Sequence, residues 1–366
     1  MFAAVAHIDL PTCNEAAIPT RSSHTHMIYS PIMLRAVIVL ASSAVTCGFL
    51  LRAQSRLLRR PACRRAVALT AARSSGWTVA PDDAVRVAVS DDSADILLKS
   101  WDEDVELCAY DGVLQHEPHV HWVDGLESHG AIVYASSTTK GPGILLVHTA
   151  VGPQDLFLRW RAEALASRGY VVLIADLLGD PLGKGWDPTF AAPRRQVYID
   201  DRPLLARRTH AALSSLAALP MVDARRLAAV GYCFGGRAVV DLIKLKPHGL
   251  QGVVSFHGVV DDEFSPDVVA RPSSSEDAPR ALLCHADADP FVPRARLDAC
   301  IASLSHLGIV WELQTFGGDA KHGFTNPAQA INPRSEFRYD PIAERSSWAA
   351  SKAFLADVLG SGHELS

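Results

Sequence analysis

The sequence lacks any pair of cysteines with C-x-x-C spacing, although it contains seven cysteines. An odd number of widely separated cysteines argues against a disulfide framework and against a zinc knuckle, and it fits a protein kept in a reducing compartment. The seven residues are Cys13, Cys47, Cys63, Cys108, Cys233, Cys284 and Cys300.

Acidic residues are absent from Ala16 to Pro81, a stretch that contains nine arginines. The whole chain has a formal net charge of −5, so the acidic excess lies in the remainder. An acid-free stretch rich in Arg, Ser and Ala is typical of an organelle transit peptide. We therefore predict that residues 1–80 are a targeting leader without a fold of their own, and that residues 81–104 are a linker and lead-in.

Residues 36–51 (AVIVLASSAVTCGFLL) form an apolar run between Arg35 and Arg52. The run is near the upper limit for a signal-peptide core and slightly short for a membrane span. A signal-like core followed by a transit-like arm resembles the bipartite leaders of plastids bounded by extra membranes. This favours a plastid over a mitochondrion, the secretory route or a membrane anchor through residues 36–51.

The remaining composition, with 48% hydrophobic and 20% charged residues overall, is that of a globular protein with a sizeable core. It gives no indication of nucleic-acid binding, and we expect no stable membrane association of the mature domain. The oligomeric state is expected to be a monomer or a small homo-oligomer.

From residue 143 onward, short apolar runs alternate with segments of helical period, which indicates a mostly parallel sheet covered by helices on both faces. Two short strands around a turn at residues 125–128 are expected to precede it. The predicted strands are residues 119–124, 129–137, 143–149, 170–177, 226–233, 252–258, 281–289 and 310–316, and the predicted helices are residues 155–169, 201–219, 235–245, 294–308 and 341–360. Residues 178–200 are predicted to be a loop.

The segment GYCFGG at residues 231–236 lies where one of these strands turns into a helix. Gly-x-nucleophile-x-Gly at such a turn is the nucleophile elbow of α/β-hydrolases, so Cys233 is a candidate nucleophile. An acid (Asp287 or Asp289) and then His322 follow in the chain order of that fold, each just after a strand. Active sites of such sheets lie at the carboxyl ends of the strands, so we predict that the cysteine, the acid and the histidine form a catalytic triad there.

These motifs resemble the dienelactone hydrolase (carboxymethylenebutenolidase-like) family. The similarity rests on PGILLVHTAVG, VGYCFGG, HADADPFVP and HGFTNP, and it extends over about residues 105–360. It implies an α/β-hydrolase domain over residues 105–362, with Cys233 as nucleophile and His322 as base. Because the acid of this family directly precedes a proline, the resemblance favours Asp289 over Asp287 as the acid.

Two backbone N–H groups are expected to form an oxyanion hole, those of Phe234, next after the nucleophile, and of Ala150 in the loop after the first buried strand. The resemblance implies a glutamate beside the thiol in this loop, but Thr149 occupies that position. Since a threonine is not a carboxylate base, thiol activation is expected to fall on His322. Thr149 and His257 are candidates for the pocket lining, with a structural role as the alternative for His257.

The remaining candidate residues are assigned to packing. His119 and His121 share one face of a predicted strand, and without a third ligand an exposed strand face is favoured over a metal site. Cys284 and Cys300 lie in apolar periodic runs and are predicted to be core residues.

The sequence therefore predicts a cofactor-independent hydrolase of small lactones or activated esters that forms a thioester on Cys233. Dienelactone itself is disfavoured, because the arginines that bind its carboxylate in the family have no match: Asn326 replaces one, and LLGD at residues 177–180 replaces the segment of the other. The alternative is a catalytically degenerate hydrolase fold that binds a small ligand or senses oxidants through Cys233.

Overall fold

The computed structural model describes residues 91–181, 184, 187–266 and 278–360 of the protein. The predicted leader over residues 1–80 and its apolar run, residues 36–51, lie outside these residues. Within the described ranges, no helix is both long enough and apolar enough to cross a membrane.

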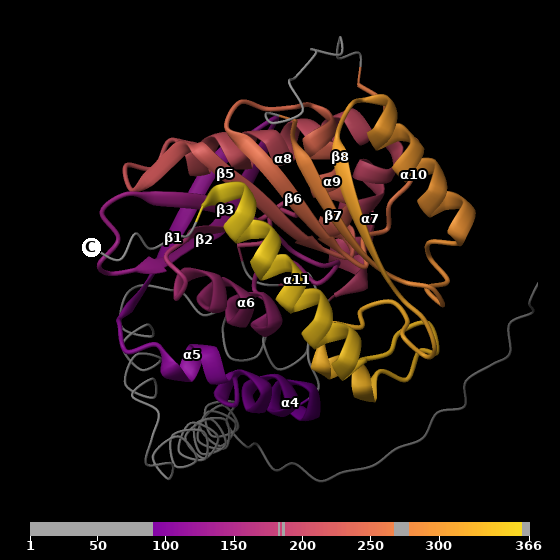
Figure 1. The fold of residues 1–366 in the computed structure, drawn as a ribbon, viewed down its shortest axis with the longest axis horizontal. Helices are drawn as coiled ribbons and strands as arrows, with labels where there is room; N and C mark the ends of the chain where they lie inside the picture. The colour runs from indigo at the N-terminus through magenta and orange to yellow at the C-terminus, as the bar shows by residue number, and fades with distance from the viewer. Residues whose placement is uncertain (1–90, 182–183, 185–186, 267–277, 361–366) are drawn as a thin grey trace, which may run out of the picture. The chain divides into compact units, whose positions relative to one another are not determined.

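An eight-stranded sheet forms the centre of the domain, with the strand order β1-β2-β4-β3-β5-β6-β7-β8 (Figure 1). β1 pairs antiparallel with β2 and β2 pairs antiparallel with β4, whereas the other neighbouring strands are parallel. The predicted α/β-hydrolase fold is confirmed. The strands are β1 (Leu114–Val123), β2 (Leu126–Ala135), β3 (Gly141–Val147), β4 (Val171–Ala175), β5 (Val222–Tyr232), β6 (Leu250–Phe256), β7 (Arg280–Ala286) and β8 (Val310–Phe316).

Helices cover both faces of the sheet and separate two apolar cores. Along β3, Leu145 packs into one core with side chains of α8, α9 and α10, and Ile144 packs into the other with α4, α6 and α11. Burial on both faces explains why the inner strands are almost wholly apolar. The helices are α4 (Asp91–Asp102), α5 (Val105–Ala109), α6 (Leu156–Ala166), α7 (Pro188–Asp200), α8 (Arg202–Ala217), α9 (Phe234–Lys244), α10 (Arg294–His306), the 3₁₀ helix η1 (Pro327–Ile331) and α11 (Pro341–Leu359).

The β1–β2 hairpin turns at Asp124 and Gly125, which both have positive φ angles, of 46° and 74°. Two consecutive residues with positive φ are the signature of a type I′ turn, and Asp-Gly is one of its preferred sequences. The turn is therefore shorter than the expected residues 125–128, and each strand is ten residues long.

The prediction that His119 and His121 face solvent is wrong. α8 packs against this face of β1, and His119 Nε2 lies 2.6 Å from Ser215 Oγ. Both rings are half-buried, and within the described residues no group of three or more His, Cys, Asp or Glu side chains could hold a metal ion.

α4 lies within residues 81–104, the range expected to be a linker. Leu97 and Trp101 on this helix are buried in the core, and Trp101 Nε1 donates a hydrogen bond to Glu163 Oε2 on α6 at 3.2 Å. The helix therefore belongs to the folded domain. Its sequence is mostly polar, and its apolar face is narrow, which makes the helix hard to recognise from composition.

We predict that Trp101→Ala lowers the free energy of unfolding by about 3–5 kcal/mol, because it empties a packed site and removes one hydrogen-bond donor to Glu163. Trp122→Ala is the matched control, since Trp122 is 69% exposed and its loss should change stability by about 0.5 kcal/mol or less. Urea titration measures both. Equal effects of the two substitutions would show that α4 contributes no packing.

Candidate active site

The nucleophile elbow lies between β5 and α9, and its backbone is strained. Cys233 has φ 56° and ψ −113°, a backbone conformation that residues other than glycine rarely adopt. A Cβ atom at Gly231 would lie 2.1 Å from Gly235 O, and one at Gly235 would lie 2.3 Å from Val147 O. Both glycines are thus needed for the tight approach of α9 to the strand ends.

His322 lies within hydrogen-bond distance of both Cys233 and Asp289. His322 Nε2 is 2.9 Å from Cys233 Sγ, and His322 Nδ1 is 2.7 Å from Asp289 Oδ2. Asp289 Oδ1 in turn accepts the Phe291 N–H at 2.9 Å, which fixes the carboxylate. Asp287, the alternative acid, is exposed, and no contact joins its side chain to His322.

The charges of this cluster stabilise each other. Burial raises the pKa of the Cys233 thiol, but the positive charge and hydrogen bond of His322 outweigh it and hold that pKa below its usual range. Burial lowers the pKa of His322, but the Cys233 thiolate and Asp289 hold it well above its usual range. These interactions favour the charged form of each group, a thiolate on Cys233 and an imidazolium on His322.

Two backbone N–H groups, from Phe234 and Ala150, point to the Cys233 sulfur and also lower the thiol pKa. They come from different elements, since Phe234 begins α9 and Ala150 follows β3. Two donors converging beside a nucleophile can hold the negative oxygen that forms when an acyl carbon is attacked.

A sequence model described as the dienelactone hydrolase family matches residues 130–359. The chain belongs to the dienelactone hydrolase family.

Two curated proteins and one solved structure are similar to this chain. The carboxymethylenebutenolidase homolog of Homo sapiens is 26% identical over 204 residues, which are 54% of this chain and 76% of that protein. An uncharacterized protein of Caenorhabditis elegans is 31% identical over 154 residues, which are 42% of this chain and 94% of that protein. The solved structure of a dienelactone hydrolase-like promiscuous phosphotriesterase from metagenomic libraries has a TM-score of 0.61 at 28% identity and covers 68% of this chain and 100% of that chain.

In this dienelactone hydrolase family member, the Thr149 hydroxyl makes a hydrogen bond within its own loop. Thr149 Oγ1 accepts the N–H of Val151 at 3.2 Å, so the hydroxyl closes a local turn in the loop after β3. The side chain is half-buried at the position expected for the glutamate of the family. It supplies no charge to the thiol, which leaves His322 as the basic group in contact with Cys233.

His257 is buried behind His322. It is 2% exposed, its Nε2 lies 2.8 Å from Thr325 Oγ1, and its ring packs edge-on against the His322 ring with 5.2 Å between centroids. Burial and the charge of His322 hold its pKa well below the usual range, so the ring is neutral. Of the two roles considered for His257, the packing role fits this placement.

Arg195 was missed by sequence reasoning because α7 was predicted to be a loop. Its Nη1 donates to Ala150 O at 2.8 Å, and the negative Cys233 thiolate opposes the lowering of its pKa by burial. Pro193 within α7 argues against a helix in the sequence. The pair Asp187-Pro188, which forms the N-cap and first turn, is the signal that could have found it.

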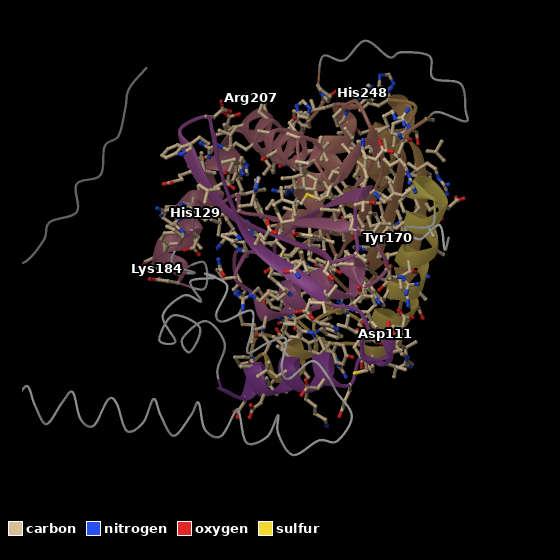
Figure 2. The ribbon with its side chains drawn as sticks, turned by 90° about the vertical axis from the view of Figure 1, so that its left-hand side faces the viewer. Asp111, His129, Tyr170, Lys184, Arg207 and His248 are labelled. Atoms are coloured by element: carbon tan, nitrogen blue, oxygen red, sulfur yellow. The ribbon has the colours of Figure 1, made fainter. Side chains whose placement is uncertain are left out.

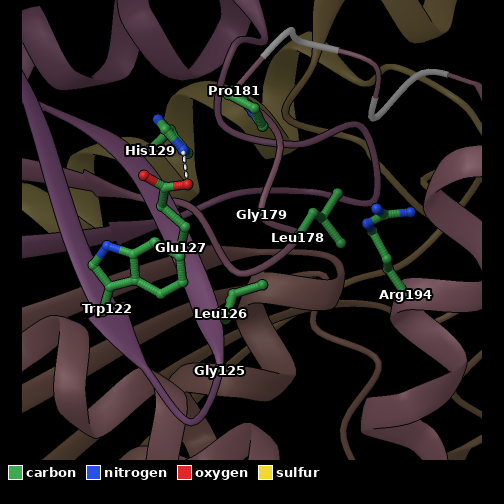
Figure 3. A pocket seen from close by; sticks show the side chains of 9 residues that line it. All are labelled: Trp122, Gly125, Leu126, Glu127, His129, Leu178, Gly179, Pro181 and Arg194. Atoms are coloured by element: carbon green, nitrogen blue, oxygen red, sulfur yellow. Dashed lines mark ion pairs between the residues drawn. The ribbon is translucent and has the colours of Figure 1, made fainter.

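A hollow of about 220 Å³ lies between the β1–β2 hairpin and the segment after β4 (Figure 3). His129 Nε2 lies 3.5 Å from Glu127 Oε2 on its wall, and Figure 2 shows His129 among the described side chains. Its lining does not include Cys233, Asp289 or His322, so it is separate from the cluster above. It is lined by Trp122, Gly125, Leu126, Glu127, His129, Leu178, Gly179, Pro181 and Arg194.

We predict that iodoacetamide alkylates Cys233 at least about tenfold faster than the exposed Cys108 at pH 6, because an ordinary thiol is almost fully protonated there. A lowered pKa keeps the thiolate present at lower pH, so His322→Ala should move the pH profile of Cys233 upward and slow the reaction at neutral pH. Peptide mass spectrometry separates the sites.

Cys284 and Cys300 are the slow controls in the same experiment, since both are buried, as predicted, and burial raises their thiol pKa. Identical profiles for Cys233 and Cys108, unaffected by His322→Ala, would exclude the ion pair in the resting protein.

Proposed function

We propose that this protein hydrolyses small lactones or activated esters through a Cys233 thioester. The observation that carries the proposal is the contact of the Cys233 sulfur with His322 Nε2 on one side and with the N–H groups of Phe234 and Ala150. Family membership supports a hydrolase of a small-molecule substrate, and the cysteine mechanism is our inference from this geometry.

In the acylation step, the Cys233 thiolate attacks the acyl carbon, and the carbonyl oxygen becomes an oxyanion held by Phe234 and Ala150 N–H. When the intermediate collapses, the bond to the leaving oxygen breaks and His322 gives it the Nε2 proton. The product is a thioester on Cys233 and a neutral imidazole. Asp289, on Nδ1, keeps that ring in the tautomer that can exchange a proton at Nε2.

In the deacylation step, neutral His322 takes a proton from water, and the hydroxide attacks the thioester carbon. The carbon–sulfur bond then breaks, which releases the acid and restores the thiolate–imidazolium pair. The cycle consumes one water molecule for each ester bond and involves no cofactor.

The leaving-group chemistry narrows the substrate class. A thiolate of lowered pKa is expelled easily, so the first intermediate goes forward only when the substrate's own leaving group is comparably good. Enol lactones, aryl esters and thioesters meet this condition, whereas simple alkyl esters do not. The half-buried Arg195 near the sulfur favours substrates that carry a carboxylate, as the name of the human relative also suggests.

We predict that the protein hydrolyses p-nitrophenyl acetate and at least one enol lactone, and that Cys233→Ala reduces turnover to the uncatalysed rate. Cys300→Ala, at a cysteine buried in α10, is the matched control and should keep the activity. The panel includes lactones with and without a carboxylate, and one aryl phosphotriester because of the similar phosphotriesterase.

Equal turnover by the wild type and Cys233→Ala would remove Cys233 from the mechanism. A wild type that is inactive on the whole panel, but whose Cys233 still alkylates rapidly, would instead support the ligand-binding or redox function.

We further predict that Asp289→Asn lowers kcat by about 10²–10⁴-fold, because an amide no longer holds His322 in its productive tautomer. Asp287→Asn changes an exposed carboxylate two residues away and should leave kcat within about twofold. Steady-state kinetics on the ester distinguishes them, and the reverse order of effects would reassign the acid.

A further inference from the structure

His148 is a buried histidine at the end of β3 that the proposed mechanism does not use. It is 0% exposed, and it contacts the two segments that carry the Ala150 and Phe234 N–H groups. Its Nδ1 lies 2.6 Å from Thr149 O in the loop that carries Ala150, and its ring stacks on the Phe234 ring with 5.7 Å between centroids.

The hydrogen bonds of His148 define one tautomer. The Thr149 carbonyl oxygen can only accept, so Nδ1 carries the proton, and the Leu177 N–H can only donate, so Nε2 accepts it at 3.1 Å. Burial lowers the pKa of His148 to about 4, which keeps the ring neutral. The ring therefore links the loop after β3 to the segment after β4 with both nitrogens in use.

The bond to Thr149 O fixes the direction of the next N–H group. In a planar trans peptide the C=O and the N–H point in opposite directions, and the described residues contain no cis peptide bond. With the Thr149 carbonyl held toward His148, the Ala150 N–H must point the other way, toward the Cys233 sulfur. Arg195 donates a hydrogen bond to Ala150 O, so the next peptide unit, between Ala150 and Val151, is held as well.

We propose that His148 is a positioning residue that aims the Ala150 N–H into the oxyanion hole by holding the Thr149 carbonyl. The inference rests on the proposed function for its effect on turnover. Its effect on the sulfur does not depend on turnover, since the same N–H also stabilises the Cys233 thiolate.

Two substitutions separate positioning from a general loss of packing. His148→Phe keeps a flat ring against Phe234 but removes both hydrogen bonds, whereas His148→Gln keeps one neutral donor and one acceptor. Ser128→Ala is the matched control, because Ser128 Oγ donates to Asp176 O next to Leu177 and its loss loosens the same segment without touching Thr149.

The measurement compares ester turnover with the alkylation of Cys233 at high pH, where the sulfur is fully ionised. Alkylation attacks a saturated carbon and forms no oxyanion. His148→Phe should lower kcat by about 10²–10³-fold, the usual effect of losing one oxyanion donor, while the alkylation plateau changes less than about threefold. His148→Gln should recover most of kcat, and Ser128→Ala should keep the wild-type ratio.

The pH profile of alkylation tests the proposal even if the protein hydrolyses no ester. Loss of the Ala150 N–H from the thiolate should move the profile of His148→Phe upward by about half a pH unit or more. An unshifted alkylation profile of His148→Phe would overturn the proposal. An equal fall of ester turnover and of the alkylation plateau in both His148→Phe and His148→Gln would overturn it as well. Inactivity of the wild type with a shifted profile would instead count against the proposed function alone.

Discussion

The hydrogen bond between His322 Nε2 and Cys233 Sγ is the interaction on which the site depends. Its two partners follow different strands, β8 and β5, so it forms only when the sheet is complete. The charges on either side change the pKa of both groups in opposite directions, which makes the pair more stable than its separate members. The other groups around it, Asp289 on the imidazole and two backbone N–H groups on the sulfur, each favour the same charged state.

The parts of the site that the sequence could predict are those set by chain order and strand ends. Cys233 and Asp289 follow apolar runs typical of buried strands, and His322 follows the mixed run of the edge strand β8. The parallel sheet brings the ends of these strands together. Asp287 and Asp289 could not be separated by this argument alone, since they lie two residues apart. The structure distinguishes them because Asp289 turns inward, with its carboxylate on His322, while Asp287 is exposed.

The parts that the sequence could not predict depend on contacts between elements far apart in the chain. α4 has a mixed composition, and only its packing on α6 reveals the role of Trp101. α7 contains Pro193, which argues against a helix. Because the sequence does not predict α7, it also does not predict where Arg195 on that helix lies. The hydrogen bonds of His148 to Thr149 and Leu177 form only because β3 and β4 are neighbours in the sheet. Local sequence patterns do not predict the order of strands in a sheet.

The crowded elbow also bears on which element could replace sulfur. Gly231 and Gly235 fix the backbone at position 233, so a serine there would place its oxygen close to where the sulfur now stands. An alcohol loses its proton far less readily than a thiol, so such a site would rest as a neutral hydroxyl beside an uncharged ring. Proton removal would then have to accompany attack instead of preceding it. The same backbone position can therefore carry either a sulfur or an oxygen nucleophile. The identity of that one atom determines whether the nucleophile and the histidine rest as an ion pair or as two neutral groups.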